Sequence, residues 1–363
     1  MKMVTVVGAR PQFIKAAALS RVLRKEHEEI LVHTGQHFDY GMSQVFFDEL
    51  ELPRPDYNLG ISGGSHAQMT ARMLIAIEEV LQKEKPDALL VYGDTNSTLA
   101  AALAAVKLHI PVIHVEAAAR LGSLSNPEEV NRITTDHVSS VLFACVPSAM
   151  EFAQKEGLTT NLFLVGDPMY DAFLYYQGKR KVEEITLTDL DDTTHPVSSE
   201  YTYLTCHRQE NTQDEETLRQ ILLGTQGLGY PVVYPVHPRN RATALKLKEE
   251  KHFKDILFVE PVGYLESNTL VSNCQRVVTD SGGVQREAFF AKKPCITVFD
   301  YVAWPETMVG GCNQLAKPLA GDILEKSKHK PVFDEGYKPF GNGDACKKIC
   351  EVLRDVDLGA RMR

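Results

Sequence analysis

The residues of this sequence best suited to chemistry are five charged side chains within one short stretch. The carboxylates of Glu116, Glu128 and Glu129 alternate with the guanidiniums of Arg120 and Arg132. An apolar run typical of a buried parallel strand comes directly before them. Because open α/β sheets bind ligands at the carboxyl ends of their strands, this stretch is expected to handle protons. The alternative is a surface loop in which these acids and guanidiniums pair with one another.

Two other expected strands of the first half also end in polar residues. Asp94 follows an apolar run and is placed for a general base, with hydroxyl residues behind it that can cap a helix. Arg10 and Lys15 follow Gly8 in a strand-to-helix turn, where cations and the helix N-terminus can hold an anion. A capped turn without a ligand is the alternative there. The dinucleotide fingerprint GxGxxG is absent.

The second half repeats this arrangement with residues suited to a nucleotide. His207 and Arg208 follow one expected strand, and His237 follows the next. A lone histidine is most often structural, but a His-Arg pair at a strand end suits a pyrophosphate. The run Ser281-Gly282-Gly283 opens a helix whose free N–H groups can approach phosphate oxygens. Glu287, one turn later, can accept hydrogen bonds from a ribose diol, so this segment is predicted to bind a nucleotide.

The elements that must position these residues alternate between strands and amphipathic helices. This pattern predicts an α/β protein with two domains, each built on a parallel, doubly wound sheet, and a cleft between them as the default site. The strands are expected at 3–8, 30–34, 88–92, 111–115, 141–146, 162–165, 201–205, 232–236, 256–259, 276–279 and 294–298. The expected parts are an N-terminal domain at 1–170, a linker at 171–199, a C-terminal domain at 200–345 and a helix at 346–363 that packs back toward the first domain.

Composition narrows the class of protein. A chain of 363 residues with 44% hydrophobic and 24% charged residues is typical of a soluble protein of two domains. The net charge of −9 argues against a nucleic-acid or membrane surface as partner. Seven scattered cysteines without a CxxC pair favour a reduced, cytoplasmic compartment, and no metal site is expected. No signal peptide or membrane-spanning run is evident.

From the residues alone, two classes of enzyme fit a nucleotide-diphosphate site in such a cleft. A glycosyltransferase that uses a nucleotide sugar needs the nucleotide site and few acidic groups. An enzyme that moves protons on the sugar needs several carboxylates with different proton affinities. The number of carboxylates favours the second class.

The chain resembles the non-hydrolysing UDP-N-acetylglucosamine 2-epimerase family along nearly its whole length. The motifs that carry the resemblance stand in order: GARPQFIK, TGQH, GDTNST, HVEA, PEEVNR, CHRQEN, YPVHPRN, DSGGVQREA, KPC and PFGNGDA. The resemblance implies a glycosyltransferase-B type of fold, with two Rossmann-like domains facing a cleft, in a homodimer. It also implies a cytoplasmic isomerase that needs no cofactor and no metal and takes a UDP-sugar substrate for surface polysaccharide synthesis.

The resemblance also implies a reaction and its residues. A base removes the proton from sugar C2 while UDP leaves C1 by anti elimination, and UDP adds back to the 2-acetamidoglucal after reprotonation at C2. The implied acid/base residues are Asp94, Glu116, Glu128 and His207, with Glu129 structural. The UDP and substrate contacts are expected from Arg10, Lys15, Arg120, Arg132, Arg208, Ser281, Gly282, Gly283 and Glu287. A second UDP-sugar, bound as activator in some bacterial members, would meet Gln36, His37, Gln68, Arg72 and His237.

The chain departs from the family pattern near the sugar. Ala9 and Gln12 in its first motif, the run at 165–171 and Trp304 instead resemble the branch that acts on UDP-2,3-diacetamido-2,3-dideoxy-glucuronate. Ala118, Ala119 and Ala303 replace the usual glycine, leucine and glutamate, and Ala118 is expected to be strained if its φ is positive. Because of these departures, the sequence does not determine which hexose the substrate carries. They also leave one alternative function open, that of a UDP-sugar-binding protein without catalytic activity.

Overall fold

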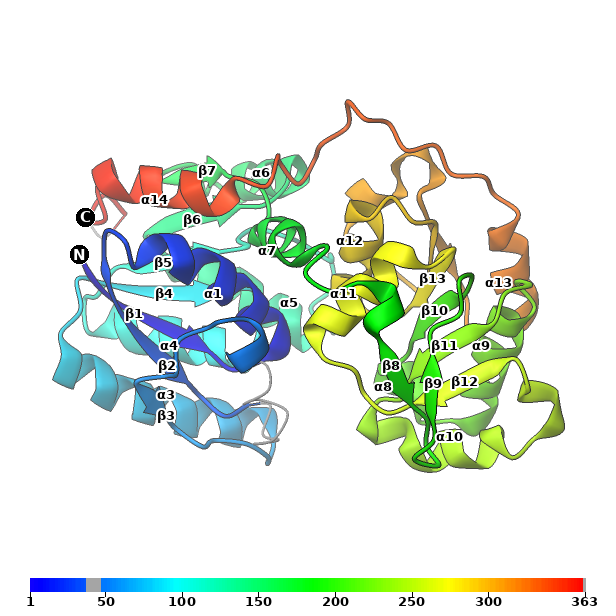
Figure 1. Ribbon diagram of the computed structural model, residues 1–363. Helices are drawn as coiled ribbons and strands as arrows, with labels where there is room; N and C mark the ends of the chain where they lie inside the picture. The colour runs from blue at the N-terminus through cyan, green and yellow to red at the C-terminus, as the bar shows by residue number, and fades with distance from the viewer. Residues whose placement is uncertain (37–46, 362–363) are drawn as a thin grey trace. The chain divides into compact units, whose positions relative to one another are not determined.

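The structure is a computed structural model that describes residues 1–36 and 47–361 (Figure 1). The chain forms two compact units. Unit 1 comprises Met1–Tyr175 and Lys338–Arg363, and unit 2 comprises Tyr176–Tyr337. Each unit is described by itself. No helix of the described residues is long and apolar enough to cross a membrane.

Unit 1 is built on a seven-stranded sheet in the order β3-β2-β1-β4-β5-β6-β7, with every neighbouring pair parallel. The central strands are almost entirely buried, because helices cover both faces of a parallel sheet. The strands are β1 (Lys2–Val7), β2 (Glu28–His33), β3 (Tyr57–Asn58), β4 (Ala88–Tyr92), β5 (Val112–Val115), β6 (Val141–Ala144) and β7 (Leu162–Leu164).

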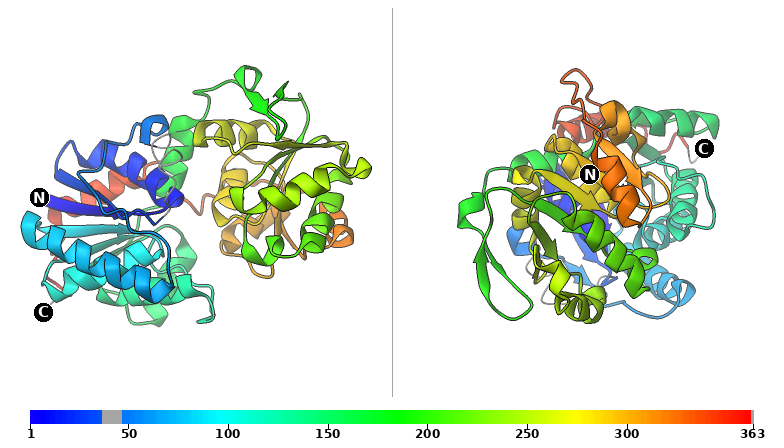
Figure 2. Two further views of the ribbon diagram at one scale, coloured as in Figure 1. Left: turned by 90° about the horizontal axis from the view of Figure 1, so that it is seen from below. Right: turned by 90° about the vertical axis from the view of Figure 1, so that its right-hand side faces the viewer.

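The helices of unit 1 cover the sheet in two layers. Figures 1 and 2 show α1 and α14 on one face and α3 and α4 on the other. The small side chains Ala100–Ala102 and Ala104 let α4 pack closely against the strands. The helices are α1 (Arg10–Leu23), α3 (His66–Glu84), α4 (Asn96–Lys107), α5 (Pro127–Val138), α6 (Pro147–Lys155), α7 (Pro168–Tyr176) and α14 (Ala345–Asp355).

Unit 2 repeats the architecture with a six-stranded parallel sheet in the order β12-β11-β10-β13-β14-β15. Its strands are β10 (Thr202–Thr205), β11 (Val232–Pro235), β12 (Ile256–Val259), β13 (Arg276–Thr279), β14 (Cys295–Val298) and β15 (Asn313–Ala316). Its α-helices are α8 (Gln209–Thr212), α9 (Glu215–Gln226), α10 (Arg241–Lys248), α11 (Tyr264–Asn273), α12 (Gly282–Phe290) and α13 (Ala320–Ser327). Four 3-10 turns join them: η1 (Val182–Glu184), η2 (Pro238–Asn240), η3 (Lys251–Phe253) and η4 (Pro305–Gly311).

The stretch 171–199, expected to be a linker, is ordered. Its first residues complete helix α7, and β8 (Thr186–Thr188) pairs with β9 (Thr194–Pro196) in an antiparallel hairpin. Ile185 and Leu187 are buried in the core of unit 2. The hairpin strands are too short to show a hydrophobic period, so the sequence pattern did not reveal them.

Candidate active site

Glu116 directly follows β5 and forms a buried ion pair. Its Oε2 lies 2.5 Å from Nζ of Lys15 on α1, and the two side chains are 10% and 3% exposed. A Cβ placed on Gly93, which follows β4, would lie 3.5 Å from Glu116 Oε1 and 3.7 Å from Lys15 Nζ. The ends of β4 and β5 and the start of α1 therefore meet around this pair, as the strand-end argument predicts.

Asp94 lies beside a second set of charges. Arg132 of α5 contacts the Asp94 carboxylate and donates to Glu129 Oε2 at 2.6 Å. The Asp94 side chain is 27% exposed and remains accessible. Burial alone would lower the pKa of Arg132, but the charges of Asp94, Glu129 and Glu116 raise it overall. Arg132 therefore stays charged and connects Asp94 to the cluster that contains Glu116.

The two glutamates at the start of α5 differ in environment. Glu129 is buried, and its Oε1 accepts hydrogen bonds from the N–H groups of Leu121 (2.8 Å) and Gly122 (2.9 Å), so it holds the preceding loop. Glu128 is exposed, and its N–H donates to the cap residue Asn126 at 2.9 Å. Of these two, only Glu128 is accessible to a ligand.

Arg120, expected to contact the substrate, is committed to the scaffold of unit 1. Its guanidinium donates to Asp136 Oδ2 at 2.6 Å and to Glu156 Oε2 at 2.7 Å, and the side chain is only 5% exposed. Burial opposes its charge, but these carboxylates raise the pKa of Arg120 above its usual value. These ion pairs help to hold unit 1 together, and the contact of Arg120 with the substrate stays a prediction.

The first motif of the chain holds two turns of unit 1 together through Gln12. Its Oε1 accepts the N–H groups of Gly8 (2.8 Å) and Ala9 (3.1 Å), and its Nε2 donates to the Tyr92 carbonyl (2.8 Å) and to Thr98 Oγ1 (2.9 Å). A carboxylate could not donate these last two bonds. The Gln12 side chain is buried, at only 2% exposed. This departure from the family pattern therefore stabilises the fold of unit 1 directly. Arg10 is half-buried at the first turn of α1.

Asp280 is the centre of the polar cluster in unit 2. His207 Nδ1 lies 3.0 Å from its Oδ1, and the N–H groups of His207 and Arg208 each donate to its Oδ2 at 2.9 Å. Burial alone would raise the pKa of Asp280, but its bonds with His207 and these N–H groups lower it to about 2. Asp280 was missed as a site residue. The signal was available, since it is the acid that directly follows the strand before the glycine pair.

Arg208 and His237 lie in the same cluster. The Arg208 guanidinium lies over the Phe299 ring at 4.1 Å and donates to the Tyr301 hydroxyl at 3.1 Å. The His207 and His237 rings are 5.8 Å apart. The His207 side chain is 41% exposed, so unit 2 presents histidine and arginine together at one place accessible to an anion.

The start of α12 provides the predicted helix N-terminus. Ser281 caps the helix by accepting the Val284 N–H at 3.4 Å. A Cβ on Gly282 would lie 3.6 Å from Trp304 Nε1 and 3.7 Å from Ala303 Cβ, so two of the departures from the family pattern border this helix start. Arg286 lies over the Trp304 ring at 4.1 Å. Gly283 follows Gly282 in the first turn, and Glu287 is buried one turn further on.

The residues predicted for an activator are divided between the two units. Gln36 accepts hydrogen bonds from the N–H (3.2 Å) and Oγ (2.7 Å) of Ser97. Gln68 forms a capping box with Ser65 at the start of α3, and Arg72 donates to carbonyls of the loop before that helix. His237 belongs to unit 2, and His37 lies outside the described residues.

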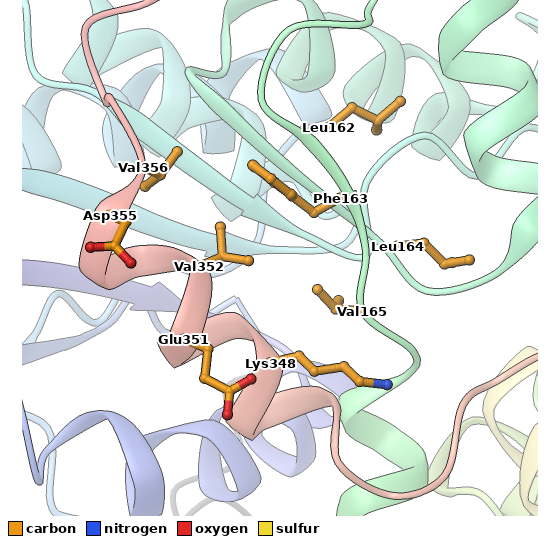
Figure 3. A pocket seen from close by; sticks show the side chains of 9 residues that line it. All are labelled: Leu162, Phe163, Leu164, Val165, Lys348, Glu351, Val352, Asp355 and Val356. Atoms are coloured by element: carbon orange, nitrogen blue, oxygen red, sulfur yellow. The ribbon is translucent and has the colours of Figure 1, made fainter.

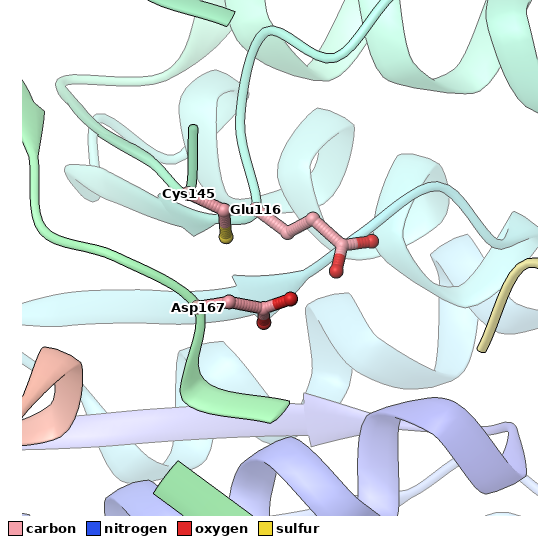
Figure 4. Close-up of side chains that lie close together, drawn as sticks. All are labelled: Glu116, Cys145 and Asp167. Carbon is pink, nitrogen blue, oxygen red and sulfur yellow. The ribbon is translucent and has the colours of Figure 1, made fainter. Parts of the chain in front are cut away.

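Glu116 also belongs to a group of three side chains of ligating types that lie close together (Figure 4). Glu116, Cys145 and Asp167 each offer one atom, and these atoms lie within 4.8 Å of one another. Lys15 already places a positive charge against Glu116 at 2.5 Å. We therefore assign no metal to these three buried side chains.

An open groove of about 630 Å³ lies elsewhere on unit 1 (Figure 3). It contains none of the candidate site residues. Its lining comes from the edge strand β7 and from the C-terminal helix: Leu162, Phe163, Leu164, Val165, Lys348, Glu351, Val352, Asp355 and Val356.

The two doubly wound parallel units, each with polar residues after its strands, define a glycosyltransferase-B type of α/β fold, as predicted. A family model described as UDP-N-acetylglucosamine 2-epimerase matches residues 21–354. The chain belongs to this family, whose members are isomerases, and the resemblance drawn from its motifs is confirmed.

Individual relatives cover the whole chain. It is 44% identical to a UDP-N-acetylglucosamine 2-epimerase homolog of Methanococcus maripaludis, over 98% of this chain and 100% of the relative. It is 43% identical to the UDP-2,3-diacetamido-2,3-dideoxy-D-glucuronate 2-epimerase of Pseudomonas aeruginosa, over 97% and 99%. The crystal structure of Methanocaldococcus jannaschii UDP-GlcNAc 2-epimerase in complex with UDP-GlcNAc and UDP matches with a TM-score of 0.86 and 38% identity, over 98% and 99%.

Proposed function

We propose that this protein is a UDP-2-acetamido-sugar 2-epimerase that works by elimination and re-addition of UDP. The observation that carries the proposal is the buried Glu116–Lys15 pair, which lies between the ends of β4 and β5 beside the accessible Asp94. A sugar held there would meet carboxylates in different surroundings, one buried against an ammonium and one partly exposed. Such a pair suits removal and return of a proton on opposite faces of one carbon.

In the proposed reaction, a carboxylate of unit 1 takes the C2 proton while the C1–O bond breaks and its electron pair leaves with UDP. A double bond forms between C1 and C2. A second carboxylate then delivers a proton to the other face of C2, and the UDP oxygen adds back at C1. Asp94, Glu116 and Glu128 are the proposed acid/base residues, since the first two follow strands of unit 1 and Glu128 is exposed in the first turn of α5.

Loss of UDP drives the elimination, so charge stabilisation at the diphosphate matters as much as the base. We assign this task to unit 2, in which His207, Arg208 and the N-terminus of α12 offer positive charge and free N–H groups. Glu287, one turn into α12, is the proposed partner of the ribose hydroxyls. Arg10, Lys15 and Arg132 would add positive charge from unit 1.

The hexose is proposed to be N-acetylglucosamine or its 2,3-diacetamido-glucuronate analogue. The similarity to the Pseudomonas aeruginosa enzyme and the presence of Trp304 and Ala303 beside Gly282 support including the second sugar. By the family resemblance we also propose a cytoplasmic homodimer that supplies activated sugars for surface polysaccharide. Sedimentation analysis of the purified protein tests the dimer.

The decisive experiment incubates the protein in deuterated water with each UDP-sugar separately and follows C2 by NMR. Epimerisation with deuterium at C2 supports the proposal, and the sugar that exchanges identifies the substrate. Transfer of the sugar to an acceptor with C2 unexchanged would instead identify a glycosyltransferase. Tight UDP binding without exchange of either sugar would identify a binding protein that has lost catalysis.

Two variants separate chemistry from binding in the same assay. Glu116→Gln is expected to abolish C2 exchange and to leave the Kd for UDP nearly unchanged, because the removed charge lies in unit 1. Glu287→Ala is expected to weaken UDP binding. Glu151→Gln, on the exposed surface of α6, is the matched control and should behave as the unaltered protein. Normal turnover by Glu116→Gln would show that the base is a different residue.

A further inference from the structure

His114 is buried in β5 between two hydrogen-bond acceptors. Its side chain is 0% exposed. Its Nε2 lies 2.7 Å from the Gly93 carbonyl oxygen, and its Nδ1 lies 2.7 Å from Asp136 Oδ1. A carbonyl oxygen can only accept a hydrogen bond, so Nε2 carries a proton. The charge of the ring then depends on the group that faces Nδ1.

That group is an ionised carboxylate. Asp136 Oδ2 accepts the Ala118 N–H at 3.0 Å and the Arg120 guanidinium at 2.6 Å. The guanidinium and the N–H group both favour the charged form of the carboxylate that they bind. An ionised carboxylate has no proton to donate, so Nδ1 must carry the second proton of the ring.

We propose that His114 is a buried, doubly protonated imidazolium that positions the two strand ends carrying Glu116 and Asp94. Charges on the surrounding elements balance it. Asp136 of α5 is negative, Arg120 of the loop after β5 is positive, and Glu156 after α6 is negative and pairs with Arg120 at 2.7 Å. Two more basic side chains border this set: His137 Nε2 lies 3.3 Å from Glu156 Oε2, and Arg361 donates to the Asp136 carbonyl at 3.4 Å.

The network holds a strained part of the backbone. Glu116 and Ala118 have φ of 66° and 62°, in the left-handed region that is strained for a residue with a side chain. Such residues persist only where their surroundings hold them. Asp136 binds the Ala118 N–H directly, and His114 holds Asp136 in turn. The imidazolium thereby helps to keep Glu116 turned toward Lys15.

The same ring controls the neighbouring strand end. The Gly93 carbonyl that it binds belongs to the residue directly before Asp94. The His114 side chain, which touches no reacting atom, therefore connects β4 and β5. It sets the distance between Asp94 and Glu116, two of the proposed acid/base residues. His114 is thus a positioning residue. Its protonation state stands on geometry alone, whereas its effect on turnover rests on the proposed function.

The protonation state is tested by NMR on the full-length protein with ¹⁵N-labelled histidine. The His114 signals, assigned by their loss in His114→Gln, are expected to show protons on both ring nitrogens. His109→Gln, at an exposed histidine of unit 1 outside this network, is the control and should leave these signals in place. A neutral ring with one N–H at neutral pH would overturn the proposal.

The positioning role is tested by turnover and binding together. A glutamine at position 114 cannot reach both acceptors with two separate donors, so His114→Gln is expected to lower kcat for C2 exchange by about 100-fold, the cost of a misplaced catalytic group. The Kd for UDP should change by less than about 2-fold, because unit 2 is untouched. Asp136→Asn, which keeps the shape, should lower kcat in the same way if His114→Gln does not fold.

Unchanged kcat in the folded variants would overturn the positioning role. Absence of exchange in the unaltered protein would refute the proposed function, while the NMR result would still decide the charge of His114.

Discussion

Ala118 is an alanine in a backbone conformation that favours glycine. Its φ of 62° meets the condition under which strain was expected from the sequence. Ala117, beside it, is equally buried, and its φ is not positive. The pair therefore offers a matched measurement of the strain at one residue.

We predict that Ala118→Gly destabilises the protein by about 1–2 kcal/mol less than Ala117→Gly does. Both changes remove a buried methyl group, worth about 0.8 kcal/mol, and both add about 0.4–1 kcal/mol of unfolded-state entropy. Only the change at position 118 also relieves the left-handed strain of about 1–2 kcal/mol. Denaturant unfolding of the two variants gives the difference. Equal losses would show that the strain is not stored at Ala118.

Asp280 links the fold of unit 2 to pH. Its pKa falls from 3.8 to about 2 on folding, despite burial, because of His207 and two backbone N–H groups. A carboxylate with a lowered folded-state pKa stabilises the fold above its unfolded value, and that contribution disappears as the pH falls from about 4 to about 2. The shift corresponds to roughly 2 kcal/mol at neutral pH.

We predict that Asp280→Asn lowers the unfolding free energy of unit 2 by roughly 2 kcal/mol at neutral pH. The difference from the unaltered protein should become smaller below about pH 4, where Asp280 of the unfolded chain begins to take up a proton while the folded state still holds it charged. The fluorescence of Trp304, the single tryptophan of the sequence, follows unit 2 during denaturant unfolding. Asp255→Asn, at an exposed position of the same unit, is the control. A difference that stays constant down to about pH 3 would contradict the assigned pKa.

Helix α5 is the element that carries much of the site scaffold of unit 1. It supplies Glu129, Arg132 and Asp136, which hold a loop, Asp94 and His114 respectively. Its N-terminus is capped by Asn126, whose side chain accepts the N–H groups of Glu128 (2.9 Å) and Glu129 (3.4 Å). Loosening this end would disturb several contacts of the site at once.

We predict that Asn126→Ala lowers stability by about 1 kcal/mol, the usual cost of a lost cap. It should also slow C2 exchange, because the first turn of α5 positions Arg132 against Asp94. Asn126→Asp keeps the cap and should be close to neutral. Calorimetry and the exchange assay measure the two effects. Full stability of the Asn126→Ala variant would mean that packing alone holds the helix start.

The strands show how much of the secondary structure the sequence pattern predicts. Every expected strand lies within about two residues of one in the structure, because a buried parallel strand needs a run of apolar residues. The pattern missed β3, the hairpin β8–β9 and β15. β3 has two residues and the hairpin strands three each, while β15 includes Asn313 and Gln314. Short or polar strands depend on their neighbours and lack a period of their own.

At the scale of the whole molecule, unit 1 is discontinuous in sequence. Helix α14 returns to it from the far end of the chain and buries Cys346, Ile349, Cys350 and Leu353. Arg354 pairs with Glu26 of unit 1, and the N–H groups of Ala345 and Cys346 donate to Asp171. The C-terminus is therefore part of the core of the first unit.

We predict that deleting residues 343–363 destabilises unit 1 by at least about 3 kcal/mol, because Ile349 and Leu353 each contribute about 1.5–3 kcal/mol when buried. Unit 2 contains no part of the deleted segment, so the unfolding transition reported by Trp304 should stay in place. Circular dichroism should show a second transition at lower denaturant. A single transition that shifts by both methods would mean that the two units unfold as one.

By itself, the sequence determined the alternation of elements and the set of polar residues that follow the strands. Both are local properties, set by hydrophobic period and by the chemistry of each motif. Only the tertiary structure decided the partners of those residues. Arg120 turns to Asp136, His207 meets Asp280 at a separation of 73 residues, and Gln12 bonds to the turn after β4. A buried charged or amide group forms an ion pair or hydrogen bond with a partner that lies near it in space. That partner comes near only when the sheet has formed.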